Sequence, residues 1–434
     1  TLLTNSLYFF VTSFDREGFM TTKQQIQVNG RVYKWPDRPV VAVCIDGSEP
    51  AYIEEAVKAG VMPWTEKIIN GQGSDLRCDC VVPSFTNPNN MSIATGVAPS
   101  VHGICGNFYY DSENDREVMM NEPHLLRVGT LFSAFQEAGA KVVIVTAKDK
   151  LRRMLGHGLT FGDGTGVCFS SEKADVATLS EHGIEGVVEL VGKEVPSVYS
   201  ADLSEFIFAA GVKLMDTIRP DIMYLSTTDY IQHKFAPGSE GANAFYAMMD
   251  GYFAQLEALG ARIALTADHG MNVKHDADGD PDVIYLQTEL DTMLGVSEAR
   301  VILPITDPYV VHHGALGSFA TVYLKPEHRA KVLAHLQAME GIEGAFDNAA
   351  GCEKFGLPTD RMGDLIVVSS INKVLGTTSE RHDLSGLDVP LRSHGGMSEQ
   401  CVPLIVSQTV TGIDASKRLR NFDIYDVVLN HVHG

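Results

Sequence analysis

The sequence has no uninterrupted apolar run near the ~18 residues that are needed to cross a bilayer. Its first segment, "TLLTNSLYFFVTSFDREGF", holds a short apolar stretch without a basic region before it, and three charged residues interrupt it. That pattern does not fit a secretory signal peptide. We therefore expect residues 1–19 to be a non-native or disordered extension ahead of Met20, with a genuine edge strand as the alternative.

Basic residues are scarce. The chain has 34 Lys and Arg against 55 Asp and Glu, which gives a formal net charge of -21. A polyanion would be repelled unless a strong local basic patch were present, and the sequence shows none. We therefore expect no nucleic acid and no membrane as a partner. A small anionic substrate is compatible with this charge where metal ions or a few lysines reverse the local potential.

The cysteines form no regular framework. Their number is odd, at seven, and an odd count in a chain of this length is typical of a reducing compartment. This predicts a cytoplasmic protein without structural disulfides. Cys78 and Cys80 form a C-x-C pair, for which we weigh metal binding against two strand residues on one face and favour the strand.

What the chain does contain is a repeated alternation of apolar strands and helical patterns. The strands are "VVAVCID" (40–46), "KVVIVTA" (141–147), "DIMYLSTT" (221–228) and "ARIALTA" (261–267). Strand, helix and strand with short loops predict an α/β protein: a three-layer αβα fold with a mostly parallel central sheet.

The pattern changes near residue 276, where shorter alternating strands and one clear helix begin. It returns to the first type near residue 385. We therefore expect a metal-binding core over residues 20–275 and 385–434, and a smaller inserted α+β cap domain over residues 276–384.

Three of the buried strands lead into a carboxylate: Asp46, Asp229 and Asp268. The carboxyl ends of parallel strands meet at one edge of a sheet, so these three residues should converge on one site. The alternative for each aspartate alone is a helix cap or a turn residue.

Three histidines favour the site. His233 follows Asp229 by four residues, a spacing that places both side chains on one face of a helical turn. His269 directly follows Asp268, and His394 lies in the glycine loop "RSHGGM". Each histidine alone is more often structural, but three beside three strand-end aspartates favour metal binding.

These ligands suit two ions. Asp229, His233 and His394 would hold one, and Asp46, Asp268 and His269 the other. Nitrogen and carboxylate ligands in open sites favour zinc, with manganese or iron as substitutes. Two zinc ions ~3.5–4 Å apart are suited to in-line displacement at phosphorus.

Thr86, in "PSFTNPNN", is then a candidate nucleophile and metal ligand. A metal favours the alkoxide form of its hydroxyl, and a helix N-terminus would attract an anionic group. The alternative is that Thr86 only caps the helix.

As a set, "VCIDG", "PSFTNPNNMSIATGVAPSVHGICGN", "TTDYIQH", "TADHGM" and "SHGGM" resemble the alkaline phosphatase superfamily, in particular its nucleotide pyrophosphatase/phosphodiesterase-like branch. The resemblance covers about residues 39–398. It implies the same fold and the same two metal-ligand sets, with Thr86 as the nucleophile. It also implies that Asn107 holds a non-bridging oxygen of the substrate, a role that an amide can fill.

Lys148 and Lys150, in "VTAKDKLRRML", match lysines that bind the negative groups of the substrate in the phosphonate-cleaving members of that branch. Their spacing suits a small dianion or trianion, and the alternative is a solvated loop. The resemblance implies hydrolysis of the carbon–phosphorus bond of phosphonoacetate to acetate and phosphate through a phosphothreonine. The carboxyl group of such a substrate delocalises the charge of the leaving carbanion, where an unactivated alkylphosphonate would have to expel a bare carbanion.

Three other functions stay open. A nucleotide pyrophosphatase/phosphodiesterase would use the same metals on a phosphorus–oxygen bond, with Phe108, Tyr109 and Tyr110 as a candidate slot for a base. A phosphomutase would also carry two metals and an inserted domain. A binding protein with a relict fold is disfavoured by the complete ligand set. A homodimer is the default expectation for the assembly.

Overall fold

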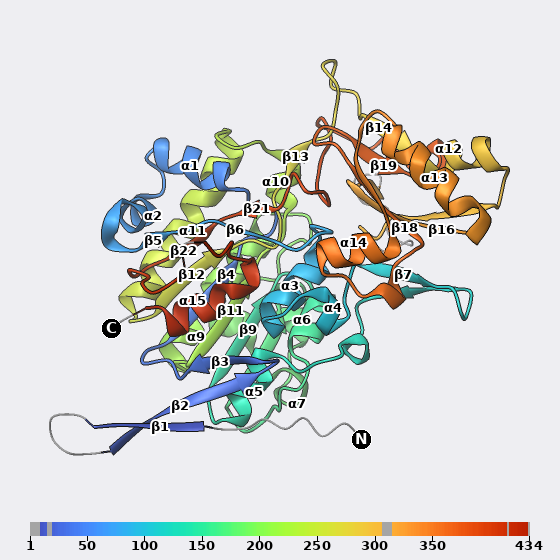
Figure 1. The fold of residues 1–434 in the computed structure, drawn as a ribbon. Helices are drawn as coiled ribbons and strands as arrows, with labels where there is room; N and C mark the ends of the chain where they lie inside the picture. The colour runs from blue at the N-terminus through green and yellow to red at the C-terminus, as the bar shows by residue number, and fades with distance from the viewer. Residues whose placement is uncertain (1–8, 15–19, 306–314, 415, 433–434) are drawn as a thin grey trace.

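The computed structural model describes residues 9–14, 20–305, 315–414 and 416–432 (Figure 1). A seven-stranded sheet lies at its centre, in the order β10-β9-β11-β4-β12-β22-β5. The strands are β10 (Gly166–Ser170), β9 (Val142–Thr146), β11 (Ile222–Ser226), β4 (Val40–Cys44), β12 (Arg262–Thr266), β22 (Leu404–Val406) and β5 (Ser74–Asp75).

The sheet is mostly parallel, as the sequence predicts. β10, β9, β11, β4 and β12 pair in parallel, whereas β22 runs antiparallel to both β12 and β5. The parallel strands are continuous runs of buried residues because helices cover both of their faces.

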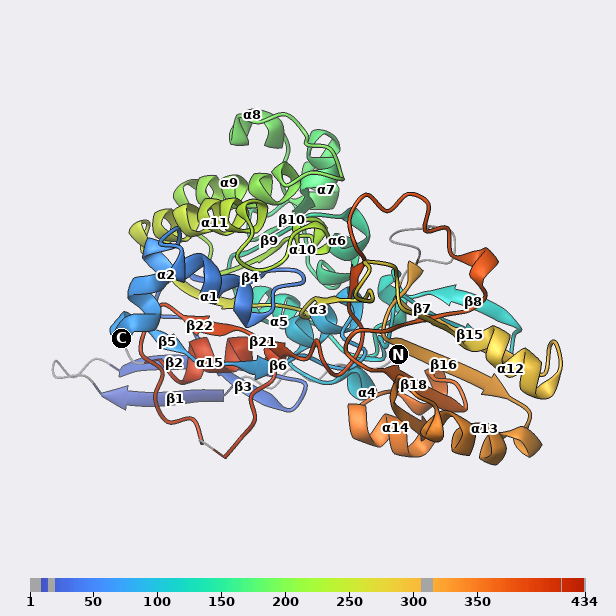
Figure 2. The same cartoon turned by 90° about the horizontal axis from the view of Figure 1, so that it is seen from above.

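Alternate residues of each strand pack into two separate hydrophobic layers. Val41 and Val43 of β4 face one layer, and Val40, Ala42 and Cys44 face the other. The first layer is covered by α1 (Pro50–Lys58), α2 (Pro63–Lys67), α8 (Val187–Val191), α9 (Asp202–Thr217) and α11 (Glu240–Ala258). The second is covered by α3 (Thr86–Thr95), α5 (Leu131–Glu137), α6 (Asp149–Leu155) and α15 (Ile424–Asn430), on the opposite side of the sheet in Figure 2.

A second, antiparallel sheet lies beside the core, at the upper right of Figure 1. Its order is β15-β16-β18-β17, and its strands are β15 (Ala299–Ile302), β16 (Phe319–Leu324), β18 (Leu365–Ser369) and β17 (Ile342–Asp347). It comes with α12 (Leu286–Leu294), α13 (Pro326–Ala338), α14 (Asn348–Phe355) and the parallel pair of β14 (Val283–Tyr285) and β19 (Val374–Gly376).

We call these elements the cap. All of them lie within residues 276–384, and the exact division of the chain there stays a prediction. The cap shares a hydrophobic cluster with the core, in which the ring of Phe85 meets that of Phe319 edge to face, with centroids 6.2 Å apart.

The remaining elements are short. The two-stranded pairs are β6 (Cys78–Asp79) with β21 (Cys401–Val402), β7 (Phe108–Asp111) with β8 (Arg116–Met119), and β13 (Asn272–Val273) with β20 (Arg392–Ser393). The short helices are α4 (Pro99–His102), α7 (Leu179–His182) and α10 (Tyr230–Lys234). No helix of the described ranges is long and apolar enough to cross a membrane.

The first described residues form an antiparallel sheet of β1 (Phe9–Phe14), β2 (Met20–Val28) and β3 (Arg31–Lys34). Residues 1–8 and 15–19 lie outside the described part of the chain. The expectation of a non-native or disordered extension over residues 1–19 therefore stays a prediction. All seven cysteines are free, and Cys78 and Cys80 are buried.

Candidate active site

Four neighbouring strands of the central sheet each lead into a residue that the sequence marks as functional. Lys148 lies two residues beyond β9, Asp229 three beyond β11, Asp46 two beyond β4, and Asp268 two beyond β12. Because these strands are adjacent and parallel, their carboxyl ends bring the four side chains to one edge of the sheet.

The first metal-ligating group consists of Asp46, Asp268 and His269. One ligand atom from each lies within 4.8 Å of the other two, and all three residues are buried. Nε2 of His269 is 3.2 Å from Oδ1 of Asp46 and 3.8 Å from Oδ2 of Asp268. The structure thus brings together the set that the sequence predicts for one ion.

Gly47 makes this close approach feasible. Its φ is +73°, and a Cβ at this position would lie 3.0 Å from Cβ of Asp229. Its N–H donates to Oδ1 of Asp268 at 3.2 Å, so the loop after β4 rests against the loop after β12.

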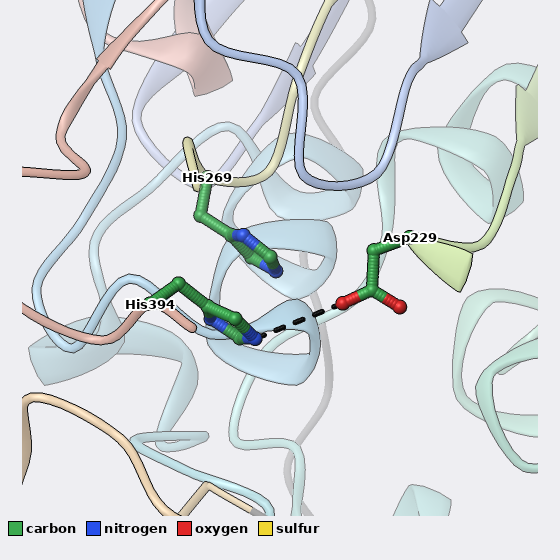
Figure 3. Close-up of side chains that lie close together, drawn as sticks. All are labelled: Asp229, His269 and His394. Atoms are coloured by element: carbon green, nitrogen blue, oxygen red, sulfur yellow. Dashed lines mark ion pairs between the residues drawn. The ribbon is translucent and has the colours of Figure 1, made fainter. Parts of the chain in front are cut away.

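The second group contains Asp229, His394 and His269, again within 4.8 Å of one another (Figure 3). Nε2 of His394 is 3.7 Å from Oδ2 of Asp229, and Nε2 of His233 is 2.9 Å from the same oxygen. The rings of His269 and His394 stack with their centroids 3.6 Å apart. His269 therefore lies between the two predicted metal-ligand sets. His233 contacts the second group through its ion pair with Asp229.

The three histidines share one orientation. Nδ1 of each lies within hydrogen-bond distance of a backbone carbonyl: His233 at 2.9 Å from Arg392, His269 at 2.9 Å from Gly270, and His394 at 2.7 Å from Ser84. Nδ1–H must donate in these contacts because a carbonyl only accepts. Nε2 is then the nitrogen with a lone pair for a metal, which is the usual support of a ligating histidine.

Oδ1 of Asp46 and Nε2 of His269 are buried and lie 3.2 Å from each other, but neither makes a well-aligned hydrogen bond to the described residues. Buried polar atoms without a partner are rare in folded proteins. Together with the set of three carboxylates and three imidazoles, these two atoms form a donor set that fits divalent metal ions.

The charges of the site depend strongly on one another. Burial, together with Asp229 and Asp268, raises the pKa of Asp46 well above its usual range. Burial opposes ionisation of Asp229 as well, but His233, His394 and Lys148 outweigh it and hold the pKa of Asp229 well below its usual range. A divalent cation would neutralise this concentration of carboxylates.

His269 responds to the same field. Burial disfavours its charge, but Asp268 and Asp46 outweigh burial and raise the pKa of His269 to about 10. Histidine coordinates a metal in its neutral form, so binding of an ion here would release a proton.

Thr86 is the first residue of α3, and the residue that precedes the helix is Phe85. The hydroxyl of Thr86 makes no hydrogen bond to the described residues, so it does not act as a helix cap. It lines a cavity of about 320 Å³ together with Asp46 and Asp229. Thr86 thus lies beside both metal-ligating groups, and its role as nucleophile stays a prediction.

Asn107, Lys148 and Lys150 line the same cavity. Nδ2 of Asn107 donates to the carbonyl of Ile305, which follows β15 in the cap. The amide nitrogen carries a second hydrogen, so one donor stays available for a substrate oxygen.

The two lysines flank the start of α6, and both are exposed. Between them, the N–H of Asp149 donates to Oε2 of Glu172 at 2.9 Å. Glu172 also lines the cavity and fixes the backbone that carries both ammonium groups.

Sequence reasoning missed two residues that support this site. Asn90 is fully buried in α3 and donates to Asp268. Glu399 accepts the N–H of Gly396 at 2.9 Å through Oε2, close to His394, and the N–H of Gly270 at 2.8 Å through its backbone carbonyl. Their position relative to the metal ligands depends on tertiary contacts that sequence spacing does not reveal.

Comparison with known proteins places the chain in a family. The model of the type I phosphodiesterase / nucleotide pyrophosphatase family matches residues 40–396. The chain therefore belongs to this family, which is part of the alkaline phosphatase superfamily.

Solved structures show a more specific likeness. Phosphonoacetate hydrolase from Sinorhizobium meliloti 1021, in complex with phosphonoacetate, is 56% identical to this chain, with a TM-score of 0.92. The match covers 95% of this chain and 100% of that one. The complex of the same enzyme with phosphonoformate gives the same values.

More distant structures share the fold alone. Murine ectonucleotide pyrophosphatase/phosphodiesterase 5 is 15% identical over 91% of this chain and 96% of its own, with a TM-score of 0.59. The alkaline phosphatase PafA is 16% identical over 89% and 94%, with a TM-score of 0.63. The predictions of an alkaline phosphatase-like α/β fold and of a hydrolase related to phosphonoacetate hydrolase are thus confirmed.

Proposed function

We propose that this chain hydrolyses the carbon–phosphorus bond of phosphonoacetate to acetate and phosphate, with two zinc ions and a phosphothreonine at Thr86. The main support is one cavity that joins the threonine hydroxyl, an amide and two lysines to the two metal-ligating groups. The identity of 56% with an enzyme solved with phosphonoacetate supports the choice of substrate.

Asp46, Asp268 and His269 would hold one zinc ion, and Asp229, His233 and His394 the other. The two ions supply Lewis-acid chemistry that favours ionisation of a hydroxyl nucleophile and neutralises charge on the oxygens of phosphorus. The contacts of Nδ1 with backbone carbonyls keep the three imidazoles oriented for this task.

Thr86 attacks phosphorus through its hydroxyl oxygen, and a new oxygen–phosphorus bond forms as the carbon–phosphorus bond breaks. The bonding electron pair leaves with carbon and is delocalised into the neighbouring carboxylate, and protonation of carbon yields acetate. Water then cleaves the phosphothreonine, which releases phosphate and restores the hydroxyl.

The other residues of the cavity bind and orient the substrate. Lys148 and Lys150 would meet its carboxylate and phosphonate charges, and Lys148 already contributes to the field at Asp229. The second hydrogen of the Asn107 amide would hold a non-bridging oxygen and stabilise the charge that develops on it in the transition state.

A nucleotide phosphodiesterase is the rival function on the same metals. Its expected base slot, Phe108 to Tyr110, forms β7. Tyr110 packs against Tyr323 at 5.0 Å between ring centroids and beneath Arg300, and none of the three aromatics lines the Thr86 cavity. This placement favours a small substrate.

The test is release of phosphate and acetate from phosphonoacetate by the zinc-loaded protein and by Thr86→Ala. We expect turnover in the wild type and a loss of about 10³-fold or more in the variant, because no nucleophile remains. Thr95→Val, at the other end of α3, is the matched control and should keep full activity. Full activity of Thr86→Ala would show that Thr86 is not the nucleophile. A strong preference of the wild type for aryl phosphodiesters would show that phosphonoacetate is not its substrate.

A cytoplasmic location and a homodimer belong to the same proposal. Seven free cysteines support a reducing compartment. Cell fractionation checks the location, and light scattering after size-exclusion chromatography checks the assembly.

A further inference from the structure

Asn90 is a fully buried polar residue of α3, four residues after Thr86. Its side chain lies between three parts of the core: the first turn of α3, strand β11 and the loop after β12. It does not line the substrate cavity.

The amide of Asn90 makes four hydrogen bonds. Oδ1 accepts from the hydroxyl of Tyr224 at 2.8 Å and from that of Ser226 at 3.1 Å. Nδ2 donates to the carbonyl of Thr86 at 3.0 Å and to Oδ2 of Asp268 at 3.2 Å.

Chemistry fixes the orientation of this amide. A backbone carbonyl and an ionised carboxylate only accept hydrogen bonds, so the NH₂ group must face Thr86 and Asp268. The two hydroxyls of β11 can both donate to the opposite side. Rotation of the amide by 180° would turn its oxygen toward two acceptors and break the contacts with Thr86 and Asp268.

The Asp268 carboxylate is thereby held at both of its oxygens. Oδ1 accepts the N–H groups of Gly47 at 3.2 Å and of His269 at 3.0 Å, and Oδ2 accepts Nδ2 of Asn90. The amide of Asn90 is therefore the side-chain donor to Oδ2 of this carboxylate.

We propose that Asn90 is a positioning residue that couples the nucleophile Thr86 to the metal ligand Asp268 through one amide group. The inference rests on the proposed function, because it assumes that Asp268 holds a metal ion beside Thr86. Asn90 sets the orientation of the carboxylate and anchors the first turn of α3, while β11 holds Asn90 itself.

Loss of such an outer contact to a metal ligand typically lowers metal affinity by about 10- to 100-fold. We expect Asn90→Ala to weaken, by that factor, the binding of the zinc ion that Asp268 would hold. The affinity for the other ion should change less than about twofold, since Asp229, His233 and His394 make no hydrogen bond with Asn90 in the described structure.

The experiment is a competition titration of zinc against a chromophoric chelator, with metal-free wild type, Asn90→Ala, Tyr224→Phe and Thr95→Val. Tyr224→Phe removes one of two donors to Oδ1 and should weaken the same ion by a smaller factor, about 2- to 10-fold. Thr95 is buried in the same helix and donates to the carbonyl of Met91 at 2.7 Å, so Thr95→Val controls for a general loss of helix stability.

Steady-state kinetics at saturating zinc add a second measurement. Because Asn90 does not line the cavity, kcat should fall while KM for phosphonoacetate changes less than about twofold. A purely structural role would lower stability without selecting one of the two ions.

The outcomes separate this inference from the proposed function. Two zinc ions with unchanged affinities in Asn90→Ala would overturn the role of Asn90 and leave the function standing. A wild type that binds no zinc would overturn both. If Asn90→Ala does not fold, Tyr224→Phe decides, and an affinity equal to that of the wild type would reject the coupling.

Discussion

The buried ion pair between Lys274 and Glu399 gives a quantitative test of how the cap is joined to the metal-ligand loops. Nζ of Lys274 is 2.9 Å from Oε1 of Glu399, and both side chains are 0% exposed. Nζ also donates to the carbonyl of Ile371, in the cap, at 2.6 Å. Glu399 further accepts from Asn272 at 2.8 Å and from the N–H of Gly396.

Lys274→Met removes the only cation that contacts this carboxylate in the described structure. The two N–H donors remain, but the charge of Glu399 stays buried without a counter-ion. Removal of one partner of such a pair typically costs about 3–5 kcal/mol of unfolding free energy. Lys274→Met/Glu399→Gln buries no charge and should recover about half of that loss or more.

The assay is urea unfolding of the metal-free protein, followed by circular dichroism and tryptophan fluorescence, so that zinc binding does not contribute. Lys325→Met is the matched control, because the Lys325–Glu298 pair is 55% and 31% exposed and should contribute about 1 kcal/mol or less. A loss below about 1 kcal/mol in Lys274→Met, or a double variant as unstable as the single one, would refute this reasoning.

Three further predictions concern individual residues. Asn107→Leu should lower kcat for phosphonoacetate by about 10²-fold because the donor to the substrate oxygen is lost, and unchanged kcat in steady-state assays would contradict that role. Burial raises the pKa of Glu49 to about 7, although Arg392 opposes the shift. The protonated Glu49 therefore stabilises the folded state, and this contribution to the free energy of unfolding is complete below the unfolded pKa of ~4.3 and is lost as pH rises through 7. Glu49→Gln should therefore lose less stability than the wild type between about pH 4 and pH 8 in urea unfolding, and equal losses would argue against the assignment. Gly395 has a φ of +121°, and an added Cβ would lie 2.5 Å from the ring of Phe85. Gly395→Ala should therefore distort the loop of His394 and lower the zinc content of the protein, which metal analysis measures. Gly386→Ala is the control and should leave the zinc content unchanged, because Gly386 has open space around it.

The sequence predicted the central sheet and the gathering of Asp46, Asp229 and Asp268 because both follow from local patterns. A buried strand is a continuous apolar run, and the carboxyl end of a parallel strand has a fixed place in the fold. Lys148 follows the buried strand β9, so the same pattern predicts it at the same edge of the sheet, and β9 is adjacent to β11.

The supporting contacts were not predictable in this way. Asn90 reads as one polar residue among several in a helix, and its four partners come from three elements that lie far apart in the sequence. His269 lies between the two predicted metal-ligand sets because its ring stacks on that of His394, a contact set by packing. The antiparallel direction of β22 also escaped the sequence pattern, since a short buried strand looks the same in either direction.

The contact between Asn107 and Ile305 has a consequence for how enzymes on this scaffold diverge. The described metal-ligating groups come entirely from the loops of the core. The amide of Asn107, which would meet the substrate, instead donates a hydrogen bond to a backbone carbonyl of the cap. A sequence change at Ile305 would therefore act on the position of Asn107 without touching the metal-ligating side chains. Exchange of this segment between relatives would thus vary the contact with the substrate separately from metal binding.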